Sequence, residues 1–90
     1  MHLISLSSPT PRNILGVIGS AQSTIAEIRP LEAKREMLTN FLVAARRAQR
    51  LFPDRLGHKG RIAGLEADLA AVRTAISAKA DAVERLLAQA

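Results

Sequence analysis

From residue 62 to the end of the chain, apolar residues recur at alternating steps of three and four. Eight of the nine positions are apolar, and the exception is Lys79. The positions are Ile62, Leu65, Leu69, Val72, Ile76, Lys79, Val83, Leu86 and Ala90. This spacing, sustained for about four heptads, places one narrow apolar stripe along an α-helix and is typical of coiled coils. We therefore predict a helix over about residues 60–89, whose stripe needs a partner.

The preceding part of the chain contains a second run with the same spacing, again interrupted once by a lysine. Its positions are Leu31, Lys34, Leu38, Phe41, Ala45, Ala48 and Phe52. The two runs are separated by residues 53–60, PDRLGHKG, in which a proline and two glycines favour a turn. Because a short connection makes two helices antiparallel neighbours, we predict a coiled-coil-like helical hairpin with a helix over about residues 30–52.

Folding the chain at this turn predicts which residues face each other. Leu38 faces Ile76, and the same register sets Lys34 opposite Lys79. We expect the aliphatic parts of both lysine side chains to cover apolar surface, while their ammonium groups reach water or nearby acids. The acids within reach of this pair are Glu32, Glu36 and Asp81.

An uncharged segment, residues 13–26, precedes the hairpin and also shows helical spacing. Its apolar positions continue to Ile28 and are Ile14, Ile18, Ala21, Ile25 and Ile28. Asn13 is a suitable N-cap after two prolines, so we predict a helix over about residues 13–28. Residues 1–12 are expected to form a flexible N-terminal arm, and residues 13–90 a single helical domain.

Pro30 decides how this segment relates to the hairpin. A proline inside a helix removes one backbone hydrogen bond and clashes with the preceding turn, so a kink or a break is expected. With a kink, residues 13–24 would overhang the hairpin without a partner in the same chain. With a break, the segment could fold back and complete a three-helix bundle. Both outcomes give an all-α protein.

The inventory of chemically reactive side chains favours a protein that is not an enzyme. The chain has no cysteine and only two histidines, His2 and His58, so neither a disulfide nor a metal site is expected. The acidic residues lie off the apolar stripes, where they suit solvated faces. We therefore predict no catalytic residue, no cofactor and no bound metal. No uncharged run is long enough to span a membrane, and we expect a cytoplasmic protein.

Basic residues are concentrated around the predicted turn. Residues 46–61, RRAQRLFPDRLGHKGR, contain six Lys or Arg side chains and one acid, within a chain of formal net charge +5. We call this stretch the tip. Near the start of the last helix, unpaired backbone N–H groups and the helix dipole favour an anion. The candidate anion-binding residues are Arg47, His58, Lys59 and Arg61.

These features favour protein–protein interaction or self-association as the function. The expected partners are another protein, for which an acidic surface would suit the basic tip, or a second copy of the chain. The predicted partner-binding residues are Ile14, Ile18, Ile25, Arg50, Arg55, Lys59 and Arg61. The alternative is binding of nucleic acid or another polyanion through the tip, which would be unspecific and strongly dependent on salt.

Overall fold

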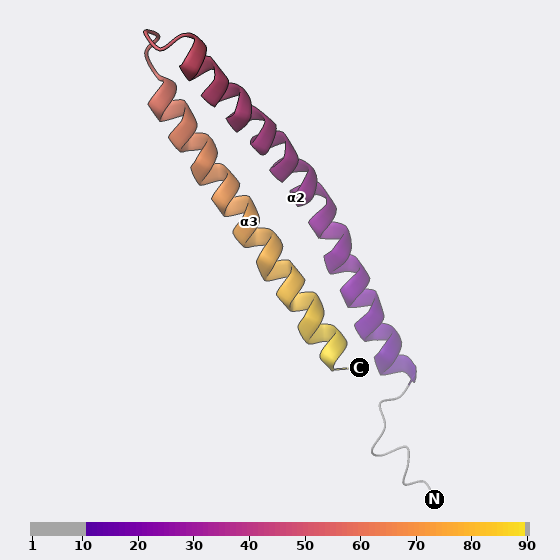
Figure 1. Cartoon of the computed structure of the whole chain (residues 1–90). Helices are drawn as coiled ribbons and strands as arrows, with labels where there is room; N and C mark the ends of the chain where they lie inside the picture. Colours follow the sequence, from indigo (N-terminus) through magenta and orange to yellow (C-terminus); the bar gives the residue numbers. More distant parts are fainter. Residues whose placement is uncertain (1–10, 90) are drawn as a thin grey trace, which may run out of the picture.

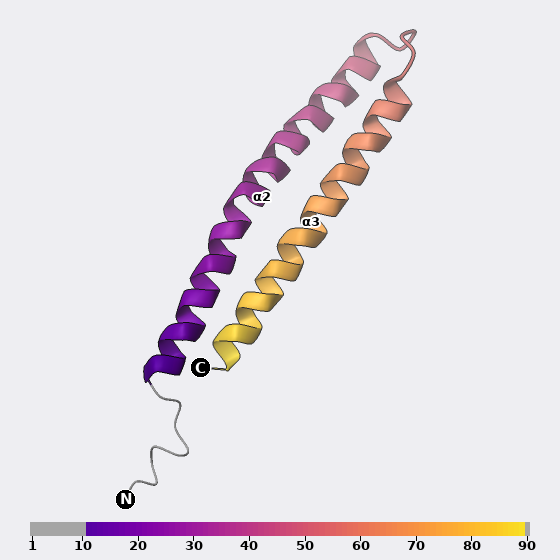
Figure 2. The ribbon, with the colours of Figure 1, turned by 180° about the vertical axis from the view of Figure 1, so that it is seen from behind.

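The chain forms a hairpin of two long antiparallel α-helices. The computed structural model describes the backbone of residues 11–89 and the side chains of residues 15–89. Helix α2 spans Pro11–Leu51, and helix α3 spans His58–Ala88. The two helices lie side by side in both views, with the turn at one end and the start of α2 and the end of α3 at the other (Figure 1 and Figure 2). The expected all-α hairpin is thereby confirmed, whereas the expected N-terminal arm lies mostly outside the described residues.

The described residues contain no separate third helix, because α2 continues through Pro30. Pro30 is exposed, and so is Ala26, whose carbonyl group loses its N–H partner at this proline. That carbonyl group can therefore be hydrated. The helix also begins at Pro11 rather than at Asn13. A proline is well tolerated at the first helical position, where its missing N–H group would have had no partner.

The stripe predicted for the last helix is the stripe that α3 buries. Leu69 and Val72 are buried, and every other predicted position from Ile62 to Leu86 is at least half-buried. These side chains pack with α2 in one apolar cluster. Its members are Leu38, Leu42, Leu69 and Val72, with Leu31, Ile62, Leu65 and Ile76 packed against them. Leu38 and Ile76, which were predicted to face each other, both belong to this cluster.

The stripe of α2 differs from the prediction at three of the seven positions, Lys34, Phe41 and Phe52. Leu38 and Ala45 are buried as expected, but Leu42 is 7% exposed whereas Phe41 is 52% exposed. Lys34 is likewise exposed, and the neighbouring Arg35 is half-buried. The buried stripe therefore lies one residue further round the helix, because Leu42 and not Phe41 faces Leu69 and Val72 in the apolar cluster. Phe52, also assigned to the stripe, is half exposed at the turn.

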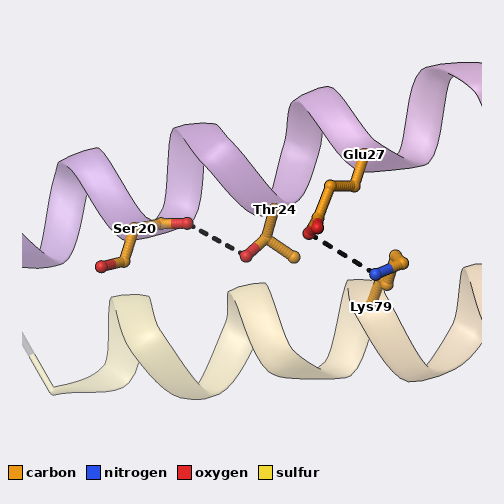
Figure 3. Close-up of polar contacts among 4 residues, drawn as sticks. All are labelled: Ser20, Thr24, Glu27 and Lys79. Atoms are coloured by element: carbon orange, nitrogen blue, oxygen red, sulfur yellow. Dashed lines mark hydrogen bonds and ion pairs between the residues drawn. The ribbon is translucent and has the colours of Figure 1, made fainter.

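The N-terminal half of α2 packs along α3 instead of overhanging it. Ala21 is only 3% exposed, and Val17, Thr24 and Ile28 are half-buried. Figure 3 shows the C-terminal end of α3 opposite the turn of α2 that holds Ser20. The kinked alternative, in which all of residues 13–24 would lack a partner in the same chain, is therefore wrong for the part of the segment that includes Ala21 and Thr24. The continuous helix allows the contact between the helices to extend about two turns further than predicted.

Two ion pairs connect the helices on opposite sides of the apolar cluster. Arg46 Nη2 of α2 lies 3.0 Å from Glu66 Oε2 of α3, and Lys79 Nζ of α3 lies 3.5 Å from Glu27 Oε2 of α2. In Figure 3, Glu27 extends across the interface toward Lys79. The pairing of Lys79 with Lys34 was therefore wrong, and the acid that neutralises Lys79 is Glu27.

Thr24 is an uncharged polar residue within the mostly apolar stripe of α2. Its side chain is half-buried, and its hydroxyl group donates a hydrogen bond of 3.0 Å to the carbonyl oxygen of Ser20 (Figure 3). Thr39, which is exposed, makes the same contact with the carbonyl oxygen of Arg35 at 2.8 Å. Local hydrogen bonds of this kind satisfy a hydroxyl group within a helix without a partner from another element.

The different burial of Leu42 and Phe41 gives a direct test of the interface. We expect Leu42→Ala to lower the free energy of unfolding by about 2–4 kcal/mol, because it removes a side chain from the apolar cluster. Phe41→Ala should cost less than about 1 kcal/mol, because half of that side chain is already exposed. Urea unfolding followed by circular dichroism at low protein concentration measures both values. A larger loss for Phe41→Ala would contradict the assigned stripe.

Candidate functional site: the tip and the apolar surface

The turn at the tip is held by backbone hydrogen bonds and one glycine. The N–H group of Phe52 donates to the carbonyl oxygen of Ala48 at 2.8 Å, and that of Arg55 donates to the carbonyl oxygen of Phe52 at 3.1 Å. Gly57 caps α3 with a φ angle of 92°, which side chains disfavour. The N–H group of Arg61 then donates to the carbonyl oxygen of Gly57 at 3.0 Å. The turn is thus a defined structure that positions its side chains.

Two of the predicted site residues at the tip are engaged with Phe52. His58 Nε2 lies 2.7 Å from the carbonyl oxygen of Phe52, so this nitrogen carries a proton and donates it. The guanidinium carbon of Arg55 lies 4.8 Å from the centre of the Phe52 ring, in a cation–π contact. His58 therefore contributes to the turn itself, which leaves only its other ring nitrogen for a ligand.

The remaining basic residues of the tip are exposed. Arg46 is held by Glu66, as described above, but Arg47, Arg50, Lys59 and Arg61 are exposed and form no ion pair with any residue whose side chain is described. The first turn of α3 contains no acid, although a helix N-terminus favours one. The structure thus brings the predicted basic residues together at one end of the hairpin.

A groove beside the helix interface runs toward the tip. Because α2 has about 3.6 residues per turn, Phe41 and Ala48 lie on the opposite side of its buried stripe from Arg46. We call the side with Arg46 and Glu66 the closed flank, and the other the open flank. On the open flank, alanines leave a hollow of about 500 Å³. It is lined by Phe41, Ala44, Ala45, Ala48, Arg61 and Leu65.

A second hollow, of about 310 Å³, continues this groove into the turn. The two hollows share Ala48 and Arg61. The second is lined by Ala48, Phe52, Arg55, Leu56, Gly57, His58 and Arg61. We call the two together the tip groove. Leu56 at its end is 98% exposed.

A second apolar surface lies at the other end of the hairpin. In a heptad pattern, residues separated by multiples of seven lie on the same side of a helix. Ile18 and Ile25 precede Arg46 by multiples of seven, and Leu87 follows Glu66 by a multiple of seven. All three therefore lie on the closed flank. Leu15 lies beside Ile18, one turn nearer the start of the helix. All four side chains are at least 40% exposed. We call these residues, Leu15, Ile18, Ile25 and Leu87, the distal patch.

The predicted site residues therefore form two separate groups. Ile18 and Ile25 belong to the distal patch, whereas Arg50, Arg55, Lys59 and Arg61 lie at the tip. The side chain of Ile14 lies outside the described residues. The sequence reasoning missed the tip groove, because Phe41 and Phe52 had been assigned to the buried stripe. A run of small residues, Ala44, Ala45 and Ala48, beside Phe41 was the available signal.

Other kinds of site find no support among the described residues. No group of three or more acidic or histidine side chains in this part of the chain is arranged to hold a metal ion. Neither α2 nor α3 has a stretch apolar and long enough to cross a bilayer. Comparisons of the chain with protein-family models, curated proteins and solved structures found no match. Functional inference therefore depends on the two surfaces.

Two glycines, one in the turn and one inside α3, give opposite predictions for the stability of the hairpin. We expect Gly57→Ala to lower the free energy of unfolding by about 1 kcal/mol, because the φ angle of 92° disfavours a side chain. Gly64→Ala should raise it by about 0.5–1 kcal/mol, because Gly64 lies inside α3 and an added Cβ atom meets nothing within 4 Å. Thermal unfolding of both variants tests this, and equal effects would contradict the assigned turn.

Proposed function

We propose that this protein is not an enzyme and acts through contacts with other protein molecules, with the distal patch as its main contact surface. The observation that carries the proposal is the exposure of four large apolar side chains on one flank, at the open end of the hairpin. Exposed apolar patches of this kind mark interaction sites, because burial of such side chains on association is favourable.

The limited interior of the hairpin supports the same function. Six apolar side chains of the described residues are buried, and none of the described residues is less than 2% exposed. The buried residues are Ala21, Leu38, Leu42, Ala45, Leu69 and Val72. Such a small interior gives modest stability, and association that covers the distal patch would add to it. A second copy or a different protein could provide this cover.

The double substitution Ile18→Asp and Ile25→Asp tests the proposal. We expect it to dissociate an oligomer, or to abolish recovery of a protein partner, because two charges would have to be buried in the contact. Light scattering after size-exclusion chromatography measures the mass, and nuclease-treated lysate provides the partners. Circular dichroism should show that most helicity remains, because both side chains are at least 40% exposed.

A matched control places the same charges on the face of α2 that points away from α3. Ala26 and Ala33 are exposed and seven residues apart, as Ile18 and Ile25 are. Ala26→Asp with Ala33→Asp should therefore leave the mass and the partner recovery unchanged. If the wild type is monomeric and recovers no protein, or if both double variants behave alike, the proposed role of the distal patch is wrong.

Binding of nucleic acid or another polyanion is the second candidate function. It is favoured by the four exposed basic side chains at the tip that lack an acidic partner among the described side chains, Arg47, Arg50, Lys59 and Arg61. The half-exposed ring of Phe52 could also stack on a base, although Arg55 already covers one of its faces. The absence of an acid from the first turn of α3 also favours an anion there.

The salt dependence of binding distinguishes this second function. If it operates with four phosphate contacts, affinity for a labelled duplex should fall about a hundredfold as salt rises from about 50 to 200 mM, because phosphate contacts release counterions. Replacement of Lys59 and Arg61 by Ala should reduce both the affinity and the slope with salt. Electrophoretic mobility shifts measure this, and no retention at about 50 mM salt would exclude the function.

A further inference from the structure

We infer that the tip groove is a docking site for an acidic amphipathic helix of a partner protein. The inference extends the proposed function to a second surface and to one class of partner. The inference depends on two properties of the groove. Its floor between the two helices is apolar, and the charged residues at its rim are basic.

The shape of the groove suits a helix. On the open flank, Ala44 and Ala48 are too short to reach across to α3, so the interface stays open beside Leu65. Phe41 forms the wall at one end and is half exposed. The groove runs lengthwise between the antiparallel helices α2 and α3. A third helix lying along it would therefore complete a three-helix arrangement. Apolar side chains at steps of three and four on the incoming helix would fill the hollows.

The charge of the groove favours an acidic occupant. Among the described residues that line the two hollows, Arg55 and Arg61 are charged, and none is acidic. Arg61 contributes to both hollows and has no ion-pair partner among the described side chains. Lys59, in the same turn of α3 as Arg61, is also exposed. A helix with Asp or Glu beside its apolar stripe would place these acids near the rim.

Residues 1–10 do not suit this role, because they contain no acid. Even when fully extended they span at most about 35 Å, whereas the 31 helical residues from Pro11 to Phe41 span about 45 Å. A symmetric contact between the grooves of two copies would bring Arg55 and Arg61 of both copies together, which repels. The apolar segment of another copy, residues 13–26, carries no charge. A different protein with an acidic helix is therefore the favoured occupant.

A pair of labelled peptides tests the inference with the full-length chain. Each peptide has about three heptads with Leu at the two stripe positions, and the flanking positions carry Glu in one peptide and Lys in the other. Fluorescence anisotropy should show saturable binding of the Glu peptide, with the Lys peptide at least about tenfold weaker. Absence of saturable binding by the Glu peptide, or equal binding of both peptides, would overturn the inference.

Two substitutions locate the peptide in the groove. Arg61→Glu should weaken binding of the Glu peptide by at least about tenfold, and its new acid suits the first turns of α3. Arg73→Glu is the matched control, because Arg73 is exposed and follows Glu66 by seven residues on the closed flank. Ala44→Leu should also block binding by filling the hollow, whereas Ala33→Leu, on the face away from α3, should not.

The result of the peptide test can be distinguished from the result of the test of the distal patch. The Ile18→Asp and Ile25→Asp variant should bind the Glu peptide as the wild type does, because the distal patch and the tip groove lie on opposite flanks and at opposite ends. If the distal patch mediates association but the Glu peptide does not bind, this inference alone fails. If a duplex oligonucleotide requires Arg61 for binding and the Glu peptide does not, the tip is a polyanion site instead.

Discussion

A pair of helices can bury only one stripe on each helix, and this constraint governs the whole molecule. The contact between α2 and α3 is continuous from Ala21 to Ala45 on one helix, and each helix leaves most of its circumference in solvent. Large apolar residues outside the stripe are consequently exposed, since no third element among the described residues covers them. The exposed apolar surface therefore results from having two layers of helix and a sequence with more apolar residues than two stripes can hold.

The sequence was sufficient to predict α3 but not the rotation of α2. On α3 a single stripe satisfies the spacing, so the prediction held at every described position. On α2 two stripes share Leu31, Leu38 and Ala45, and they differ only in the residues between. One adds Lys34 and Phe41, and the other adds Arg35 and Leu42, so hydrophobicity does not choose between them. The structure selects the second, which also places Arg46 beside Glu66 and Glu27 beside Lys79, and such pairing cannot be read from one helix alone.

Pro30 also shows that a local sequence preference was not sufficient to predict the structure. A proline in the interior of a helix costs about 3 kcal/mol, which justified the expectation of a kink or break. The cost is tolerated here because the proline and the affected carbonyl group of Ala26 lie on the solvent side, while residues before and after it, Ile28 and Leu31, contact α3. Tertiary packing on both sides thus outweighs the local preference, and the N-terminal segment becomes part of the hairpin. The candidate site at the distal patch exists only because of this continuity.

The two ion pairs between the helices lie on opposite flanks and toward opposite ends of the hairpin. Arg46 and Glu66 cover the closed flank near the tip, and the apolar groove lies across from them. Toward the other end, Glu27 lies fourteen residues before Phe41 and thus on the open flank, where it meets Lys79, and the distal patch lies across from that pair. Near the tip, the closed flank carries the ion pair and the open flank is apolar. At the other end, the open flank carries the ion pair and the closed flank is apolar. A partner that covered the distal patch would therefore leave the tip groove accessible.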